Sequence, residues 1–392
     1  MLFSLALILL CGVVLGGIVQ KLKLPGLLGM IITGIILGPY VLNLISPNIL
    51  GISTDLRQIA LIVILTRAGL ALDIKDLKAV GRPAILMCFI PATFELVAVT
   101  LFAPLLFGIT YLESGIMGAV LAAVSPAVVV PRMLKLMEEG YGKEKSIPQM
   151  IMAGASVDDI YVIVLFTSFL GMYSGQGFNI MSLATVPISI ISGICLGILV
   201  GLVAVWIFKK IHMRDTIKIM LLFSLAFSMI ALEKVAGNYI PISGLLAIMA
   251  LGATILKKYE ILAKRLSIKY NKIWVGAELF LFVLVGAAVD ISYVGSAGLQ
   301  TVSLIFLALA FRITGVFACM LKTKISIKEM LFCAIAYLPK ATVQAAIGSI
   351  PLALGVAAGN TILTIAVVSI LVTAPLGAIG IDLTYKKLLT RE

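Results

Sequence analysis

Two adjacent acids and one lysine lie inside apolar stretches of the sequence, where charged side chains are rare. Asp158 and Asp159 follow "MAGASV" in the stretch at 148–172, and Lys340 follows "AYLP" in the stretch at 328–350. A charge at the centre of a bilayer costs roughly 2.5–3.5 kcal/mol, so such residues usually serve a function. Neighbouring residues of a helix point about 100° apart, so one aspartate can pair with Lys340 while the other binds a cation. A proton and a hard cation would compete for the same carboxylate oxygens.

Prolines interrupt two apolar stretches close to these charges. Pro126 and Pro131 fall in the stretch at 113–134, and Pro339 directly precedes Lys340. A proline inside a helix removes a backbone donor and clashes with the preceding turn. The freed backbone groups are tolerated in a membrane only where protein buries them or water reaches them. The sequence therefore predicts two crossed broken helices that meet beside the acids and the lysine.

Apolar residues dominate the composition and are arranged in long runs. Of the 392 residues, 61% are hydrophobic and 12% are charged, whereas a soluble protein is nearer half apolar and a quarter charged. A helix needs about 20 apolar residues to cross the hydrocarbon layer. Thirteen stretches approach or exceed that length, at 2–20, 25–44, 56–72, 83–107, 113–134, 148–172, 182–208, 216–232, 240–256, 273–290, 298–320, 328–350 and 360–385. We predict an all-α membrane protein with about 13 transmembrane helices, forming a single transporter domain over 1–392.

The basic residues are concentrated in alternate connections between these stretches. Twenty-five of the 30 Lys and Arg residues lie in one set of connections and the C-terminus, and only Arg57 and Lys234 lie in the other set. Positively charged loops stay in the cytoplasm, so we expect the N-terminus outside and the C-terminus inside the plasma membrane. This placement accounts for the net charge of +12 without a nucleic-acid partner. Gly-rich nucleotide-binding loops do not occur in a strand-to-helix context, so no cofactor is expected.

The two halves of the chain contain similar segments about 217 residues apart. The run "LTRAGLALD" ends at Asp73, and the run "FVLVGAAVD" ends at Asp290. Residues 1–172 and 216–385 therefore form two predicted repeats, which the helix at 182–208 connects. Equivalent spans run in opposite directions, so the repeats are inverted in the membrane, as in many secondary transporters.

The same offset relates two further charged residues, because Glu95 plus 217 gives Arg312. Both lie in apolar stretches, so we predict a buried ion pair between them. The pair could be a static lock or a gate that rearranges during transport.

Three segments together resemble a known transporter family. "SVDD", "RAGLALD" and "LPKATVQAA" are similar to the double-aspartate sodium/proton antiporters of the second cation:proton antiporter superfamily. The likeness extends over nearly the whole chain and is closest to the branch that includes the animal sodium/hydrogen exchangers 9B and their bacterial relatives. It implies exchange of Na⁺ or Li⁺ for H⁺ by a homodimer, whose core domain moves against a dimerisation domain in an elevator-like cycle.

The resemblance also implies roles for particular residues. Asp159 matches the essential ion-binding carboxylate, and Asp158 matches its partner, which would form a salt bridge to Lys340 when the ion is absent. Ser125 would lend an oxygen to the bound Na⁺ or Li⁺ from the first helix break. The family has a further carboxylate in that break, and this chain has none.

Other functions compete with this interpretation. A potassium/proton antiporter would use the same type of site, and a sodium-coupled solute symporter of related fold would need a larger polar pocket. An intramembrane aspartyl protease needs two aspartates that face each other from different helices, so we do not expect an enzyme. The stoichiometry stays open, because two protons could exchange per ion if Lys340 also carries one.

Overall fold

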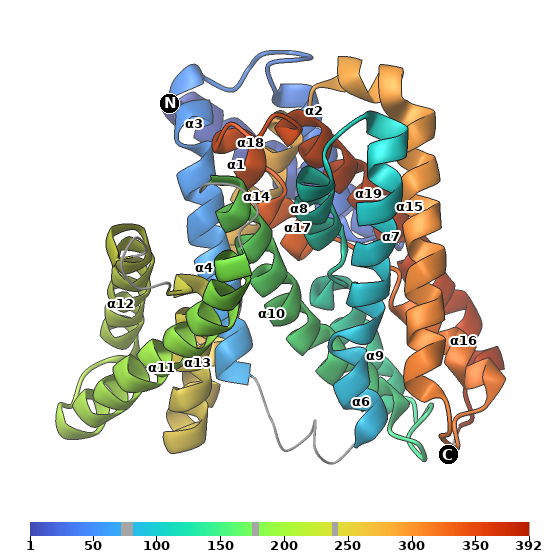
Figure 1. The fold of residues 1–392 in the computed structure, drawn as a ribbon. Helices are drawn as coiled ribbons and strands as arrows, with labels where there is room; N and C mark the ends of the chain where they lie inside the picture. Colours follow the sequence, from blue (N-terminus) through green and yellow to red (C-terminus); the bar gives the residue numbers. More distant parts are fainter. Residues whose placement is uncertain (72–80, 175–179, 237–241, 392) are drawn as a thin grey trace. The chain divides into compact units, whose positions relative to one another are not determined.

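The computed structural model describes residues 1–71, 81–174, 180–236 and 242–391, and the regular elements in these residues are helices (Figure 1). They are α1 (Leu2–Lys21), α2 (Gly26–Leu37), α3 (Pro47–Gly51), α4 (Ser53–Ala71), α6 (Arg82–Met87), α7 (Ile90–Phe107), α8 (Tyr111–Leu121), α9 (Pro126–Glu138), α10 (Ile147–Ser174), α11 (Ile180–Lys210), α12 (Asp215–Ala236), α13 (Gly244–Lys258), α14 (Glu260–Ala287), α15 (Ile291–Met320), α16 (Ile327–Ala336), α17 (Thr342–Ile347), α18 (Ile350–Ala353) and α19 (Gly359–Leu388). Asp73, which ends the first repeated segment, lies outside the described residues.

Each of the thirteen apolar stretches overlaps between one and three consecutive helices. Nine helical segments among the described residues are long and apolar enough to cross a membrane. The other four stretches overlap helices that fall short for physical reasons. Helices α2 and α13 have only 12 and 15 residues, and α4 contains Asp55, Arg57 and Arg67. The stretch at 328–350 is divided among α16, α17 and the start of α18.

The chain forms two compact units, and neither is a continuous half of the sequence. Unit 1 comprises residues 1–54, 74–170 and 279–392, and unit 2 comprises residues 55–73 and 171–278. Both predicted repeats, over 1–172 and 216–385, contribute residues to both units. Contacts between distant segments, rather than chain order, therefore define the units.

In unit 2, small residues allow α11 to pack closely on α13 (Figure 1). Gly193 and Gly197 of α11 are one turn apart. A Cβ atom at Gly193 would collide with the backbone of Ser243, the N-cap of α13, and one at Gly197 with the backbone of Ala247 in α13. Small residues spaced four apart are a common way for membrane helices to approach each other.

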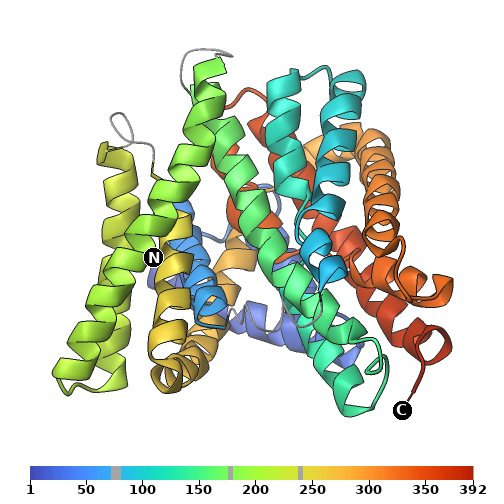
Figure 2. The same cartoon turned by 60° about the horizontal axis from the view of Figure 1, so that its bottom comes forward.

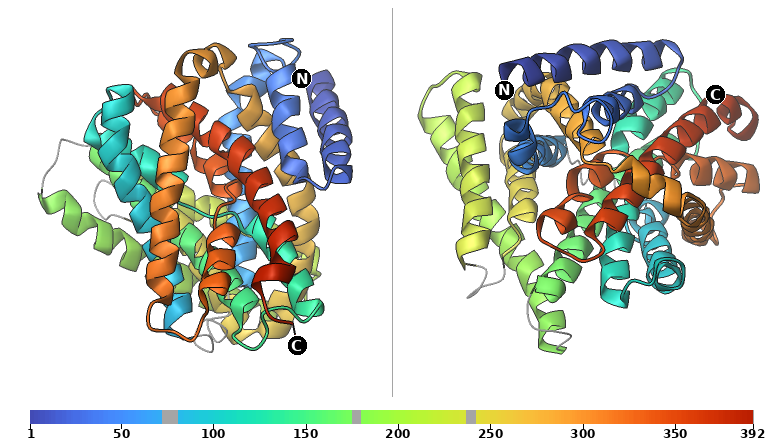
Figure 3. Two further views of the ribbon diagram at one scale, coloured as in Figure 1. Left: turned by 90° about the vertical axis from the view of Figure 1, so that its right-hand side faces the viewer. Right: turned by 90° about the horizontal axis from the view of Figure 1, so that it is seen from above.

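In unit 1, α7 packs between α8 and α15 (Figure 2), and α16 lies beside α19 (Figure 3). Helices α8 and α16 begin in the same way. The hydroxyl of Thr110 accepts from the N–H of Glu113, whose carboxylate accepts from the N–H of Thr110, and Ser326 and Glu329 repeat this capping box. Such a box satisfies two N–H groups that the first turn of a helix leaves free. The two boxes are 216 residues apart.

Both helices then stop within the apolar region. Helix α8 ends at Leu121 and α9 begins at Pro126, while α16 ends at Ala336 and α17 begins at Thr342. The two interruptions touch, since the N–H of Ser125 donates to the carbonyl of Pro339 over 2.8 Å. The prediction that Pro131 also interrupts the helix is wrong, because α9 continues through it. Only Pro126, at the first helical position, marks the break, where its missing N–H costs nothing.

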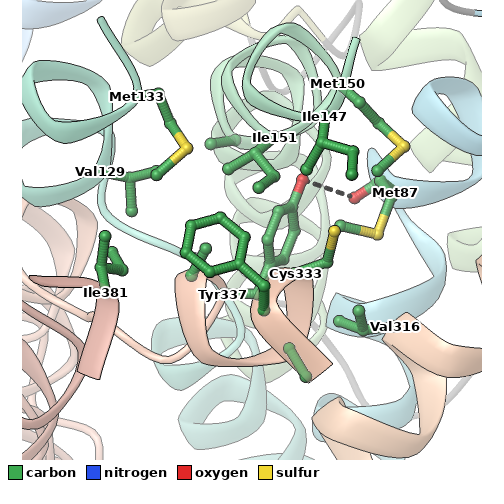
Figure 4. Close-up of a cluster of buried hydrophobic side chains, with 14 of the residues drawn as sticks. Met87, Val129, Met133, Ile147, Met150, Ile151, Val316, Cys333, Tyr337 and Ile381 are labelled. Carbon is green, nitrogen blue, oxygen red and sulfur yellow. Dashed lines mark hydrogen bonds between the residues drawn. The ribbon is translucent and has the colours of Figure 1, made fainter. Parts of the chain in front are cut away.

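An apolar cluster supports the second break (Figure 4). It draws side chains from α6, α9, α10, α15, α16 and α19, and Tyr337 lies at its centre next to the end of α16. The Tyr337 hydroxyl donates to the carbonyl of Met87 over 3.5 Å, and it fits there because position 154 is a glycine. Replacing a large aromatic side chain in such a core by alanine lowers the free energy of unfolding by about 3–5 kcal/mol. The cluster therefore holds Tyr337 firmly, and with it the residues that follow in the break.

Candidate functional site

Three side chains from the second half of the chain cap the end of α8. The last carbonyls of a helix have no partner within that helix. Lys340 Nζ donates to the carbonyl of Leu121 over 2.6 Å, and the Arg312 guanidinium donates to the carbonyl of Ala122. Gln344 Nε2 donates to the carbonyls of Ala123 and Leu121, over 2.9 and 3.3 Å. Two of these groups are cations, which suit the negative end of the helix dipole.

The same cations form a buried chain of alternating charges with two acids. Lys340 Nζ lies 2.6 Å from Glu95 Oε1, and Glu95 Oε2 lies 2.7 Å from the Arg312 guanidinium. Arg312 also lies 3.1 Å from Asp158 Oδ2. All four side chains are at most 1% exposed. The ion pair expected between Glu95 and Arg312 is therefore present, and it forms the middle of a longer chain.

The salt bridge expected between Asp158 and Lys340 does not form among the described residues. Lys340 contacts Glu95, and Asp158 contacts Arg312. The reason is the position of α7 next to both α8 and α15, which lets the two oxygens of Glu95 reach one cation each. Asp158 Oδ2 also accepts from the N–H of Val124 in the first break, over 2.9 Å.

Asp159 lies next in sequence but has no ion-pair partner in the part of the chain that the structure describes. The residue is 8% exposed, and its Oδ1 atom has no hydrogen-bond partner there. A buried carboxylate without a partner is costly in its charged form. Asp159 is therefore the acid in this cluster that an added cation or proton would stabilise.

Ser125 occupies the N-cap position of α9 without capping it. A serine at this position commonly accepts a hydrogen bond from the first turn, but the Ser125 side chain makes no such bond. Its hydroxyl is buried and has no hydrogen-bond partner among residues 1–71, 81–174, 180–236 and 242–391. The oxygen is thus available for a ligand beside the first break.

The charges of the cluster do not cancel. Glu95 and Asp158 balance Arg312 and Lys340, so the chain of ion pairs is neutral. An ionised Asp159 adds one negative charge, which one monovalent cation or one proton neutralises.

Sequence reasoning missed Gln344 and Thr373. Gln344 caps α8, and the hydroxyl of Thr373 accepts from the backbone N–H of Lys340 over 3.0 Å. For Gln344 there was a signal, because a neutral amide four residues after Lys340 is unusual in an apolar helix. No comparable signal marks Thr373, since isolated threonines are common in membrane helices.

The described residues combine helices of membrane-spanning length, two touching helix breaks and buried charges at those breaks. This combination is typical of a multi-pass secondary transporter rather than an enzyme. Residues 5–387 match the family described as sodium/hydrogen exchanger, transmembrane. The chain belongs to this family.

Individual relatives agree with this assignment. The chain is 33% identical to human sodium/hydrogen exchanger 9B1, in an alignment that covers 100% of this chain and 79% of the human protein. Human sodium/hydrogen exchanger 9B2 is 32% identical, with 100% and 75% covered. The fold is similar to that of the sodium proton antiporter MjNhaP1 from Methanocaldococcus jannaschii, with a TM-score of 0.84, 21% identity, and 98% of this chain and 97% of that chain covered.

Proposed function

We propose that the protein exchanges Na⁺, or Li⁺, for H⁺, and that Asp159 binds the cation and the proton in turn. The observation that carries this proposal is the buried Asp159 carboxyl, which has no ion-pair partner among the described residues and follows Asp158, the acid bound to the first of two touching helix breaks. Burial disfavours the charged form of Asp159. The site is therefore stable when a cation or a proton is bound, and unfavourable when neither is bound. Because both ions neutralise the same carboxylate, binding of one displaces the other.

Oxygen atoms of Asp158 and of the first helix break suit a hard cation. Asp158 Oδ1 and Ser125 Oγ are buried, and neither has a hydrogen-bond partner within the described residues. Backbone carbonyls at interrupted helices coordinate Na⁺ in other transporters. Asp159, Asp158 and Ser125 are therefore the proposed ligands of Na⁺ or Li⁺, while Lys340 and Arg312 stay with Glu95.

The charge balance also leads to a proposed stoichiometry. Lys340 contacts Glu95 and the carbonyl of Leu121, both of which favour its charged form. Burial opposes this charge, so the proposal requires that these contacts outweigh the cost of burial: Lys340 then keeps its proton when the cation binds, and one proton is exchanged per cation. Such exchange moves no net charge and does not respond to membrane voltage, whereas each net charge moved would gain about 2.3 kcal/mol per 100 mV.

The wider architecture is part of the same proposal. The chain would form thirteen spans, with inverted repeats at 1–172 and 216–385, and with the C-terminus in the cytoplasm of a plasma-membrane homodimer. The equivalent capping boxes and the contact between the two breaks support the inverted repeat. A core that carries the site would move against a dimerisation domain in an elevator-like cycle.

Everted vesicles with a pH-sensitive dye test the function. Wild-type protein should dissipate an acid interior when Na⁺ or Li⁺ is added, and Asp159→Asn should abolish this response because it removes the exchangeable charge. Glu260→Gln, which changes an exposed acid of α14 paired with Lys264, serves as the control. An imposed voltage should leave the rate unchanged.

Other outcomes would select a competing function. A response to K⁺ larger than that to Na⁺ would favour a potassium/proton antiporter. Exchange at the wild-type rate by Asp159→Asn would contradict the assignment of the binding residue. Sodium-driven uptake without proton movement would favour a symporter.

A further inference from the structure

We propose that Gln344 provides a neutral oxygen ligand to the transported cation and so contributes to the choice between cation and proton. This inference rests on the proposed exchange function, and it assigns a role to a residue of "LPKATVQAA" that the ion-pair chain does not use. The evidence is the orientation of the amide, its burial and its place at the break.

Hydrogen bonds fix the orientation of the Gln344 amide. Its nitrogen has two N–H donors, and two carbonyl acceptors lie within reach, those of Ala123 and Leu121. The reverse orientation would place the amide oxygen against these two carbonyl oxygens, which is repulsive. The nitrogen therefore faces the end of α8, and the oxygen points away from it.

The oxygen is buried and has no hydrogen-bond partner in the described part of the chain. Gln344 is 0% exposed, and Oε1 accepts no hydrogen bond from those residues. Leaving a buried polar atom unpaired costs about 1–3 kcal/mol. Such an atom in a native protein calls for an explanation, for which a bound ion is one of the usual ones.

Gln344 contacts the same short segment as the charged residues. It shares the carbonyl of Leu121 with Lys340, and it holds the carbonyl of Ala123. The next residue, Val124, donates its N–H to Asp158. The Gln344 side chain thus lies at the first break, although its own helix, α17, follows the second break.

An amide oxygen distinguishes a cation from a proton. Amide oxygens coordinate hard cations, as the asparagine and glutamine ligands of other metal sites do. They are not protonated near neutral pH, and Gln344 carries no charge that would alter the proton affinity of Asp159. Loss of the Gln344 oxygen should therefore weaken cation binding and leave proton binding unchanged.

Replacement of Gln344 by Met, which is of similar size but lacks both polar atoms, tests this in purified protein reconstituted in proteoliposomes. KM for Na⁺ and for Li⁺ is measured across a range of pH. We expect Gln344→Met to raise KM for Na⁺ about tenfold at every pH, which corresponds to about 1.4 kcal/mol, and to change the ratio of the Li⁺ and Na⁺ constants. The pH at which protons halve transport at low Na⁺ should stay at the wild-type value.

Ser114→Ala is the matched control, because it removes a buried hydroxyl from α8 far from the break and should keep wild-type constants. Thermal unfolding of the detergent-purified protein with increasing Na⁺ gives a binding measurement that does not need transport. If Gln344→Met does not fold, Gln344→Asn keeps the amide on a shorter side chain and should still change the Li⁺-to-Na⁺ ratio.

The results separate this inference from the proposed function. If Na⁺ neither drives proton exchange by the wild-type protein nor raises its unfolding temperature, the exchange function itself is contradicted. Exchange by the wild type together with an unchanged KM and cation ratio in the folded Gln344 variant would overturn only the role of Gln344. An equal change in cation and proton binding would also overturn it, because that result indicates general distortion of the site.

Discussion

At each of the two helix breaks, a backbone N–H donates to a side chain of another helix, but the two acceptor side chains differ. In the first break, the N–H of Val124 donates to Asp158 of α10. In the second break, the N–H of Lys340 donates to Thr373 of α19. The donors are 216 residues apart and the acceptors 215. A carboxylate at the first break thus corresponds to a neutral hydroxyl at the second, so only the first break contacts an acid.

The charges of the site are divided between the halves by sign. Glu95, Asp158 and Asp159 come from the first half, and Arg312 and Lys340 come from the second. Every ion pair in the cluster therefore joins the two halves. Breaking a buried pair by removal of one partner is costly because it leaves the other charge uncompensated.

Glu95→Gln should produce the largest effect, because it removes the acid that contacts both cations. We expect loss of exchange, and a decrease in the free energy of unfolding of about 3–5 kcal/mol. Vesicle exchange and denaturant unfolding of the purified protein measure the two effects. The double variant Glu95→Gln with Lys340→Met restores the charge balance and should recover part of the stability. Wild-type stability of the single variant would show that Glu95 does not hold the halves together.

The equivalent acceptors of the two breaks should differ in the effect of their removal. Asp158→Asn keeps an oxygen for the Val124 N–H but leaves Arg312 with one acid, so we expect exchange to fall more than tenfold. Thr373→Val leaves the Lys340 N–H unsatisfied, which should cost about 1–3 kcal/mol of stability and leave KM for Na⁺ unchanged. Transport and unfolding assays on both variants make the comparison. If Thr373→Val raised KM as much as Asp158→Asn does, the two halves would share the ion-binding role.

Sequence patterns predicted those features that depend on local composition or on the repeat. The thirteen long apolar runs all overlap helices, and the 217-residue offset pairs Glu95 with Arg312, which form an ion pair in the structure. Hydropathy reports the apolar part of a helix rather than its ends, so α14 begins at Glu260 instead of residue 273. Whether Lys340 lies within reach of Glu95 depends on how the helices pack around α7, and no local sequence pattern contains that information. The bond between Lys340 and Glu95 was missed for this reason.

The smallest effect is expected from the two hydroxyls at the starts of α9 and α17. Ser125 and Thr342 are 217 residues apart, both are about 1% exposed, and neither hydroxyl has a hydrogen-bond partner within the described residues. Only Ser125 belongs to the break that meets Asp158. We therefore expect Ser125→Ala to raise KM for Na⁺ several-fold, by about 0.5–1.5 kcal/mol for one oxygen contact, and Thr342→Val to leave it unchanged. Equal shifts in KM would mean that the cation lies between the two breaks and takes an oxygen from each.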